Sequence, residues 1–514
     1  MIFKTHHGFS WWASALLAVI SGALIVLSVP TFDVFFLAWV GLVPLTAAVA
    51  SPGRTLKSAF ACGWITGIVV HMGGFYWLDS TMVRFGNLHP ALAFGIFLIF
   101  GLVSGLSYGI VALMLRMMIV RSVPTPVALA VSLVVVEAFF PHLFQWLLAM
   151  SHWRIPLAIQ TAEIWGAAGI SAVLAMVNGA VFDKIAWDTG WTVKTRRALA
   201  WTRIVAVGVC LIMVYGAVRI EMVEAVSRNL PAVKVGIVQP AISIEEKKTP
   251  SFAMRNLWLL QSFSSNLEQR GAEIIVWPET SYPFRIPRTQ TRDFDGLRKI
   301  SYHTTVPIVA GAVSYGNGEF FNSTYLVTED ERLVGPSDKN NLVLFGEYNP
   351  LYSIVPESLR IKYPALARRG MSPGGAPGIL RHGRLSLGVL NCLEDILASY
   401  TARVVRSGAN LLVNVTNDAW FGDTAEPYQH LALAVFRAVE TRRTLVRSVN
   451  TGISAVVDLT GRIVAMSEPY SQDTILLDVR LSNLATPFQA TGNVLGWICG
   501  AMFLLILALR RRKT

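Results

Sequence analysis

The sequence predicts a bundle of eight transmembrane helices joined to one large α/β domain outside the cytoplasm. Hydrophobic residues make up 53% of the 514 residues and charged residues only 15%, which is too apolar for a soluble protein of this length. A membrane-spanning helix needs about 20 mostly apolar residues. Such stretches occur near residues 11–29, 33–50, 58–78, 91–115, 124–141, 164–182, 203–220 and 492–509.

The orientation of the predicted bundle follows from its short loops. The first apolar stretch lacks a convincing small-x-small cleavage site and further spans follow it directly, so we expect it to be retained and not removed as a signal peptide. The loops on one side carry only Arg84 and Arg154. The other side is predicted to be cytoplasmic, since basic residues accumulate there: Lys4, Arg54, Lys57, Arg116, Arg121, Lys184, Lys194, Arg196, Arg197, Arg203 and the tail at 510–513.

Three segments result from this topology. Residues 1–220 are predicted to form the first seven spans, residues 221–490 a soluble domain outside the cytoplasm, and residues 491–514 the eighth span with a basic cytoplasmic tail. In a bacterium with two membranes, the soluble domain would face the periplasm from the inner membrane. The net charge of +12 is largely explained by the loops and the tail, so we expect no binding of nucleic acid. Small residues such as Gly101, Ser104 and Gly105 indicate close helix packing.

The soluble segment alternates short β-branched runs with helical patterns. This alternation predicts a layered α/β domain. Helices are expected over 252–270 and 427–444, and strands over 233–238, 273–277, 307–313, 386–391, 410–415, 454–458 and 474–479.

Cys392 is the one cysteine of four that lies outside the predicted spans. A lone thiol in an oxidising compartment has to be buried or employed in chemistry, and a single cysteine is more often a buried packing residue. Cys392 follows an apolar strand and precedes a predicted helix that begins near Glu394. Backbone N–H groups at such a helix start can lower the pKa of a thiol and hold an oxyanion.

Glu279 and Lys339 are the candidate partners of this thiol. Glu279 ends a strand, which brings its carboxylate to the same sheet edge as Cys392, and Lys339 lies in a polar loop. Taken singly, each is more often a solvated turn acid or a surface lysine. Together they make chemical sense, because a thiol with an unperturbed pKa of about 8.5 needs a base and a nearby cation to react near neutral pH.

Three blocks around these residues resemble the signature blocks of the nitrilase, or carbon-nitrogen hydrolase, superfamily. The blocks are VWPET at 276–280, residues 339–348 with FGEY at their end, and NCLE at 391–394. Within that superfamily the chain resembles the apolipoprotein N-acyltransferase family in its eight-span topology and in NDAWFGD at 417–423, Gln429, His430 and residues 447–452. The resemblance implies an αββα sandwich with a lipid-facing active site, and neither a cofactor nor a metal.

The resemblance also implies a ping-pong reaction. A cysteine takes an acyl chain from a phospholipid as a thioester, and the α-amine of a lipoprotein's S-diacylglyceryl-cysteine then takes that chain. Carried over to this sequence, Cys392 is the nucleophile, Glu279 the base and Lys339 the oxyanion cation. Glu347 and Glu394 are expected to be supporting carboxylates near the site. The backbone N–H of Leu393 is a candidate second oxyanion donor by its position, and Asn322 matches a further family position near the site but could equally be a turn residue.

Several positions depart from the family pattern. Asn341 stands where the family usually has His, Leu344 where it has Pro, and Leu393 where it has Tyr. The loop after Pro240 lacks the usual Trp and offers Lys247 and Lys248 instead. These changes leave the three candidate catalytic residues intact, but they alter the rim of the site and leave the identity of the acyl acceptor open.

Two other functions are compatible with the sequence. The chain could be a membrane-anchored amidase or acyltransferase of the nitrilase type with a different acceptor. Seven spans before the domain and one after it are more than an anchor for a small-amide hydrolase requires, and a membrane-facing pocket excludes water from a thioester. A catalytically silent paralogue that acts as a binding or assembly module would be expected to have lost the triad, whereas Glu279, Lys339 and Cys392 are all present.

Overall fold

A computed structural model describes most of the chain: residues 8–30, 32–84, 86, 88–189, 191, 196–344, 346–350, 352, 354–358 and 370–509. Lys4, Lys194, Phe345 and the basic tail at 510–513 lie outside the described residues. The contacts divide the chain into two compact units. The first comprises Met1–Val223, Thr424–Phe436 and Thr486–Thr514, and the second comprises Glu224–Asp423 and Arg437–Ala485.

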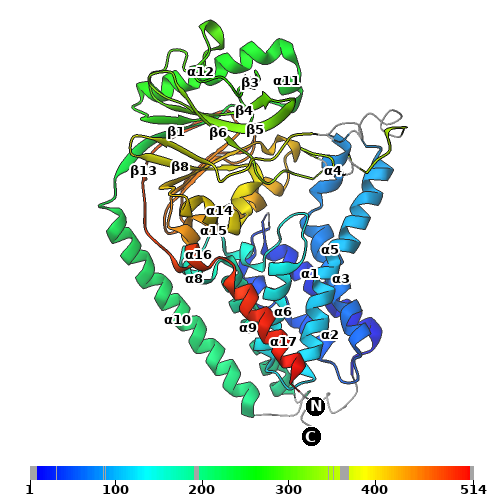
Figure 1. Ribbon diagram of the computed structural model, residues 1–514. Helices are drawn as coiled ribbons and strands as arrows, with labels where there is room; N and C mark the ends of the chain where they lie inside the picture. The colour runs from blue at the N-terminus through cyan, green and yellow to red at the C-terminus, as the bar shows by residue number, and fades with distance from the viewer. Residues whose placement is uncertain are drawn as a thin grey trace. The chain divides into compact units, whose positions relative to one another are not determined.

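The first unit is helical (Figure 1). Its short helices and turns interrupt longer apolar ones, and α15 (Glu426–Thr441) contributes its first part to this unit. The remaining helices are α1 (Trp11–Ser28), η1 (Phe35–Trp39), α2 (Val43–Ala50), α3 (Leu56–Gly74), α4 (Trp77–Arg84), α5 (Pro90–Ile119), α6 (Thr125–Phe139), η2 (Leu148–His152), α7 (Pro156–Ile159), α8 (Ala162–Trp165), α9 (Ala167–Thr189), α10 (Arg196–Ser227), α16 (Pro487–Thr491) and α17 (Val494–Ala508).

Four helices among the described residues are long and apolar enough to cross a membrane, namely α1, α5, α9 and α10. A fifth span results if α3 and α4, which meet at a bend of 51°, are counted as one. The other three predicted stretches coincide with shorter apolar helices, Phe35–Ala50, Thr125–Phe139 and Val494–Ala508. The apolar helices are confirmed, whereas the predicted number of eight spans is not.

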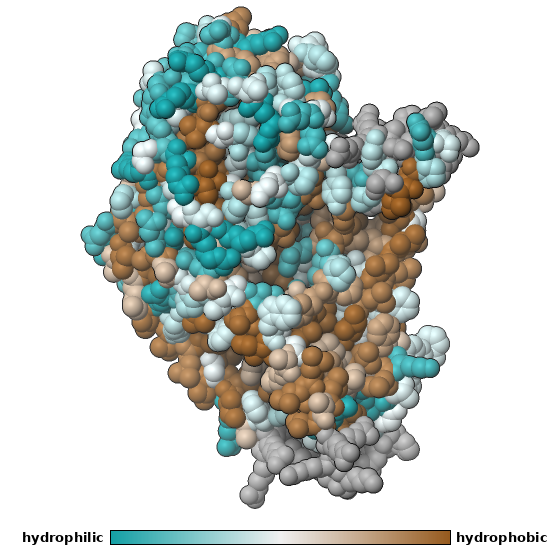
Figure 2. Space-filling view, viewed as in Figure 1, coloured by the Kyte–Doolittle hydropathy of each residue, from teal (hydrophilic) through white to brown (hydrophobic). Residues whose placement is uncertain are grey.

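The outer surface of these helices is apolar. Figure 2 shows hydrophobic residues in brown over much of the first unit. Leu211 on α10 is 64% exposed, and Trp497 on α17 is 69% exposed. A soluble protein rarely exposes so large an apolar surface, so the surface is typical of a membrane protein.

Helices α3 and α5 approach each other closely through glycines. A Cβ atom on Gly67 would lie 2.2 Å from the carbonyl oxygen of Gly105, and one on Gly63 would lie 2.2 Å from that of Tyr108. No side chain fits where two helix backbones come this close, and small residues at such crossings are typical of membrane bundles. The small residues singled out in the sequence therefore have a packing role.

The second unit contains two β-sheets packed face to face. The first sheet has the order β13-β1-β2-β4-β5-β6, with β3 beside β4, and the second has the order β12-β11-β10-β9-β8-β7. The strands of the first are β1 (Ala232–Gln239), β2 (Ile274–Val276), β3 (Ile286–Pro287), β4 (Ile308–Gly316), β5 (Glu319–Val327), β6 (Leu333–Asp338) and β13 (Asp473–Arg480). Those of the second are β7 (Ile379–His382), β8 (Leu385–Asn391), β9 (Leu411–Thr416), β10 (Leu445–Val449), β11 (Ala455–Val457) and β12 (Ile463–Met466).

The core of this unit lies between the sheets. Val235 and Ile237 of the first sheet belong to one buried apolar cluster with Val389 and Val413 of the second. A second cluster joins the first sheet to α12 (Ala253–Gln269) through residues such as Leu257 and Leu260. On the second sheet, α14 (Ala398–Arg406) packs against Gly388 of β8 through Val404. The layered α/β domain predicted from the sequence is confirmed.

The order of elements differs from the prediction in detail. The helix expected over 427–444 ends at Thr441, and the next residues turn through Arg442, with φ of +46°, into strand β10. Strand β10 begins only a few residues after the helix ends, and both are apolar. The sequence pattern therefore did not show where the helix ends and the strand begins. Strands β3, β5, β6, β7 and β12 were also not predicted.

Candidate functional site

The three candidate residues lie directly after strands of both sheets. Glu279 and Lys339 follow β2 and β6 of the first sheet, whereas Cys392 follows β8 of the second. The expectation that Glu279 and Cys392 share the edge of one sheet was therefore wrong, because the two residues come from sheets that pack face to face. The exposed fractions of Glu279, Lys339 and Cys392 are 6%, 1% and 7%. Residues separated by 60 and by 53 positions in the sequence therefore share one buried site.

Lys339 and Asn322 each contact two carboxylates. The Lys339 ammonium lies 3.4 Å from Oε1 of Glu279 and 2.8 Å from Oε2 of Glu347. The Asn322 amide, on β5, donates to Oε1 of Glu279 at 2.6 Å and to Oε1 of Glu347 at 2.9 Å. Both carboxylates are thus held in place by a cation and an amide, and Asn322 is buried within the site instead of lying in an exposed turn.

The thiol of Cys392 is protonated in this environment. Burial raises its pKa well above the ordinary value, Glu279 adds to the rise, and Lys339 opposes it. Burial alone would lower the pKa of Lys339, but nearby acidic groups, with Glu279 and Glu347 carrying negative charge, raise it well above the ordinary value, so the lysine keeps its charge. A neutral thiol therefore lies under the influence of a carboxylate and a permanent ammonium.

The backbone at Cys392 is strained. Its φ is +52°, in the left-handed region that residues with a side chain rarely adopt. The residue begins the short 3-10 helix η6 (Cys392–Ile396). Asn414 holds the turn, since its amide donates to the carbonyl oxygens of Leu390 at 2.9 Å and Cys392 at 3.0 Å. Strain that is maintained by such contacts is common at active sites.

Glu394 ties the Lys339 loop to the Cys392 strand. Its Oε1 accepts the backbone N–H groups of Asn340 at 2.7 Å and Asn341 at 2.9 Å, and its Oε2 accepts that of Asn391 at 3.0 Å. Burial raises its pKa, and these N–H groups oppose the rise. Glu394 is therefore a positioning residue that connects two of the three candidate blocks.

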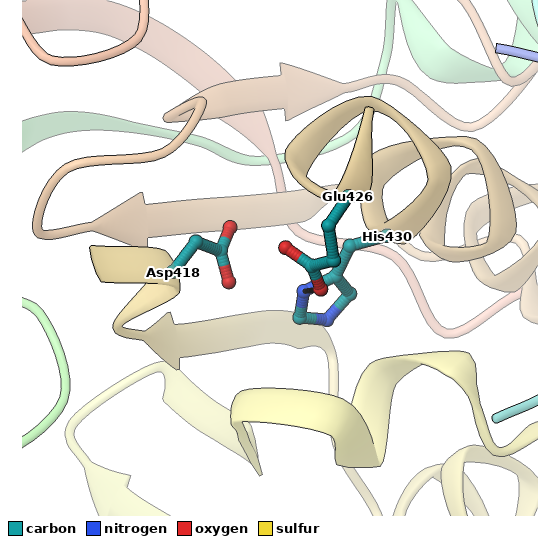
Figure 3. Close-up of side chains that lie close together, drawn as sticks. All are labelled: Asp418, Glu426 and His430. Atoms are coloured by element: carbon teal, nitrogen blue, oxygen red, sulfur yellow. Dashed lines mark ion pairs between the residues drawn. The ribbon is translucent and has the colours of Figure 1, made fainter. Parts of the chain in front are cut away.

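A buried arginine on β10 contacts residues of the same region. Arg447 on β10 forms ion pairs with Asp395 and, at 3.0 Å, with Asp418, and donates to Asn414 Oδ1 at 3.1 Å. Figure 3 shows Asp418 on the turn that follows β9, and Glu426 and His430 on successive turns of α15. Because Asn414 also holds the Cys392 carbonyl, Arg447 acts on the position of Cys392 through it.

A groove of about 690 Å³ lies beside the Lys339 loop. Two of the positions that depart from the family pattern, Asn341 and Leu344, line it. Its other walls include Tyr348, Tyr352 and Met371. The lining therefore combines amide, aromatic and apolar groups, and among the described residues that line the groove none carries a charge.

The sequence matches two family models. Residues 21–180 match the apolipoprotein N-acyltransferase N-terminal domain, and residues 234–486 match the carbon-nitrogen hydrolase family. The apolipoprotein N-acyltransferase of Geobacter metallireducens is 31% identical over 97% of this chain and 96% of its own length. That of Allorhizobium ampelinum is 33% identical over 88% of this chain and 87% of its own length.

The chain belongs to the apolipoprotein N-acyltransferase family. This confirms the resemblance found in the sequence and makes the chain an acyltransferase. Among solved structures, an amidase from Nesterenkonia sp. is similar at 17% identity and a TM-score of 0.38, over 52% of this chain and 95% of that one. The carbon-nitrogen hydrolase match covers the second unit's two sheets, and the N-terminal match covers helices α1 to α9 in part or whole.

Some residues of this acyltransferase's site were not singled out by sequence reasoning. Asn414 contacts the backbone of Cys392. Lys247 contacts the backbone of Glu279, and the sequence marked it only as a departure from the family pattern. Asp395 and Arg447 form a buried ion pair near Cys392. The only signal available was that Arg447 lies in a block shared with the family. A buried charge has to be paired, but the spacing of residues in the sequence does not show which residue is its partner.

Proposed function

We propose that this chain transfers an acyl chain from a phospholipid to the α-amino group of the S-diacylglyceryl-cysteine at the N-terminus of lipoproteins, through a thioester on Cys392. The observation that carries the proposal is the convergence of Glu279, Lys339 and Cys392 in one buried site of a chain from this family. Phospholipid donor, diacylglyceryl-lipoprotein acceptor and membrane are therefore the proposed partners.

In the first half-reaction Glu279 accepts the thiol proton while the sulfur attacks the ester carbonyl carbon of the phospholipid. The negative charge that develops on the carbonyl oxygen is stabilised by the Lys339 ammonium and by the backbone N–H of Leu393. The carbon–oxygen bond then breaks, and the lysophospholipid oxygen leaves with the proton from Glu279. Glu347, Asn322 and Glu394 hold the base, the cation and the nucleophile in position.

In the second half-reaction the α-amine attacks the thioester carbonyl. Glu279 takes the proton of the attacking amine and returns it to the departing sulfur, which restores the thiol. The groove beside Lys339 is the proposed site of the acceptor, because its asparagines and tyrosines suit a polypeptide better than a fatty chain. Burial of the thiol, at 7% exposure, supports the exclusion of water from the thioester.

The proposed topology follows from the charge of the loops. Residues 1–220 would form spans 1 to 7 and residues 491–514 the eighth span, with both termini in the cytoplasm. Residues 221–490 would form the catalytic domain in the periplasm of a two-membrane bacterium, with the protein in the inner membrane. Attachment of a labelling reagent at introduced cysteines on either side of intact cells tests this orientation.

The chemical test uses the purified full-length protein with a phospholipid that carries a fluorescent acyl chain. We expect an acyl adduct that hydroxylamine removes, that Cys392→Ser lacks, and that passes to a synthetic diacylglyceryl-cysteinyl peptide. An adduct that reacts with water or with another amine, but not with this peptide, would contradict the acceptor. Absence of any adduct would contradict the nucleophile.

A further inference from the structure

Lys247 occupies a position beside the proposed base that no family block assigns. It lies on the short helix α11 (Ile244–Lys248), and its side chain is partly buried. The ammonium donates to the main-chain oxygen of Glu279 at 3.1 Å and to the Thr280 hydroxyl at 3.3 Å. A second lysine therefore contacts the residue that is the proposed base. Lys247 precedes Glu279 in the chain, whereas Lys339 follows it.

The segment that carries Lys247 is built into the domain. Asn450 on the second sheet's side accepts the N–H of Ala241 at 2.9 Å through its carbonyl and that of Ile242 at 3.1 Å through its side chain. Its amide also donates to the Ile242 carbonyl at 2.7 Å. Ser243 then caps α11 by accepting the Glu246 N–H at 3.1 Å. The residues just before Lys247 are thus fixed by hydrogen bonds, and they position its side chain at Glu279.

The backbone that Lys247 contacts is strained. Thr280 has φ of +45°, which a threonine adopts only when its surroundings enforce it. The ammonium contacts both the carbonyl that precedes this residue and the Thr280 hydroxyl. It is therefore placed to hold the turn that orients the Glu279 carboxylate.

Lys247 adds a positive charge to a site that is rich in carboxylates. Glu279 and Glu347 both contact the single ammonium of Lys339. Lys247 places a second ammonium next to Glu279. An excess negative charge beside Cys392 would make removal of its proton harder, because like charges raise the pKa of a thiol.

We propose that Lys247 is the second cation of this site and that its charge is required for rapid acylation of Cys392. The proposal rests on the proposed function, since it assigns Lys247 as a positioning residue for the base of that reaction. Within the described part of the chain, Lys247 makes no hydrogen bond to the Cys392 sulfur, and it acts through its contact with Glu279.

Lys247 loses its charge within an accessible pH range. Burial lowers its pKa to about 8, and the charge of Glu279 opposes that change. The groups that face it from other elements are Glu279 and, beyond it, Lys339, Glu347 and Cys392. On its own helix, Glu246 is paired with Arg255 at 3.0 Å, Glu245 is exposed, and Lys248 lies over the ring of Trp420 at 5.2 Å. The ammonium is present below pH 8 and is lost above it.

The test measures single-turnover acylation of full-length protein by the fluorescent phospholipid between pH 6.5 and 9.5. We expect the wild-type rate to fall as pH rises through about 8. Lys247→Met should be slower at pH 7 by about tenfold or more and should lack this fall. Lys247→Arg should restore the rate at pH 7 and also lack the fall, because arginine stays charged across this range.

Lys248→Met is the matched control, since it removes an adjacent charge that lies over Trp420 and not beside Glu279. It should keep both the rate and the fall near pH 8. A fall that persists in Lys247→Arg would overturn the proposal, as would equal rates of wild type and Lys247→Met. Thermal unfolding of each variant separates a folding defect from these effects. If wild type forms no Cys392-dependent adduct at all, it is the proposed function that fails.

Discussion

Replacing Glu279 by Gln tests the proposed base with little disturbance of the site. The Asn322 amide, 2.6 Å from Oε1, can donate equally to a glutamine oxygen, and Lys339 keeps its 2.8 Å ion pair with Glu347. The variant should therefore fold. A general base contributes about 10²- to 10⁴-fold to a rate, or about 2.7–5.4 kcal/mol of activation free energy. We expect acylation of Cys392 to slow by that factor at pH 7.

The pH dependence of the residual rate makes the test specific. Because burial raises the pKa of Cys392 well above the ordinary range, a variant without the base must use the small fraction of thiolate. That fraction increases tenfold for each pH unit below the pKa, so the residual rate should increase with pH at that slope. Single-turnover acylation at several pH values measures it, with Glu347→Gln as the control that removes a charge but leaves the base. A Glu279→Gln rate within a few-fold of wild type would refute the reasoning.

Three further substitutions test the support of the site and of the helices. Arg447→Met removes a buried cation that pairs with both Asp395 and Asp418, and should reduce the free energy of unfolding by about 3–5 kcal/mol, measured by denaturant titration in detergent. Gly67→Ala should lower the melting temperature, since its Cβ would lie 2.2 Å from a backbone oxygen, whereas Gly95→Ala on α5 meets nothing within 4 Å and should be neutral or stabilising. Leu344→Trp should narrow the groove beside Lys339 and raise the KM for the diacylglyceryl peptide while thioester formation is unchanged; an unchanged KM would contradict the acceptor groove.

The general architecture was predictable because it depends on local patterns. Apolar stretches of sufficient length indicate membrane helices, and all eight predicted stretches coincide with apolar helices. What length and composition could not predict is how each helix is interrupted. The stretch near 58–78 bends by 51° between Gly74 and Trp77, and the one near 33–50 is divided between η1 and α2. Such breaks depend on packing against other helices.

One missed strand did have a local signal. Asn317 and Gly318 both have positive φ, +52° and +77°, and join β4 to β5 as a two-residue hairpin. An Asn-Gly pair between β-branched or aromatic runs is a strong hairpin signal, and it would have predicted β5. The signal was masked by the polar residues of β5, including Asn322, whose side chain serves the site and not the apolar core.

The candidate residues were predictable from motifs, but their contacts were not. Each block places a polar residue after an apolar strand, and the family resemblance brings the three blocks to one site. The strand before Cys392 belongs to a different sheet from those before Glu279 and Lys339, so a shared sheet edge does not explain their proximity. The residues that hold them, such as Asn414, come from other strands and depend on the register between β8 and β9. Register is a property of pairing, which a single sequence does not display.

The raised pKa of Cys392 answers the question that a lone thiol poses in the proposed periplasmic location. A thiolate is the form that oxidants and disulfides attack, whereas a protonated thiol reacts slowly. Burial and Glu279 keep the resting sulfur protonated, and the residue is only 7% exposed. The same carboxylate that raises the pKa of the thiol is the proposed acceptor of its proton, so protection and activation both depend on Glu279. Reactivity would then depend on the arrival of a substrate whose developing negative charge Lys339 can stabilise, instead of on a thiolate that is present at all times.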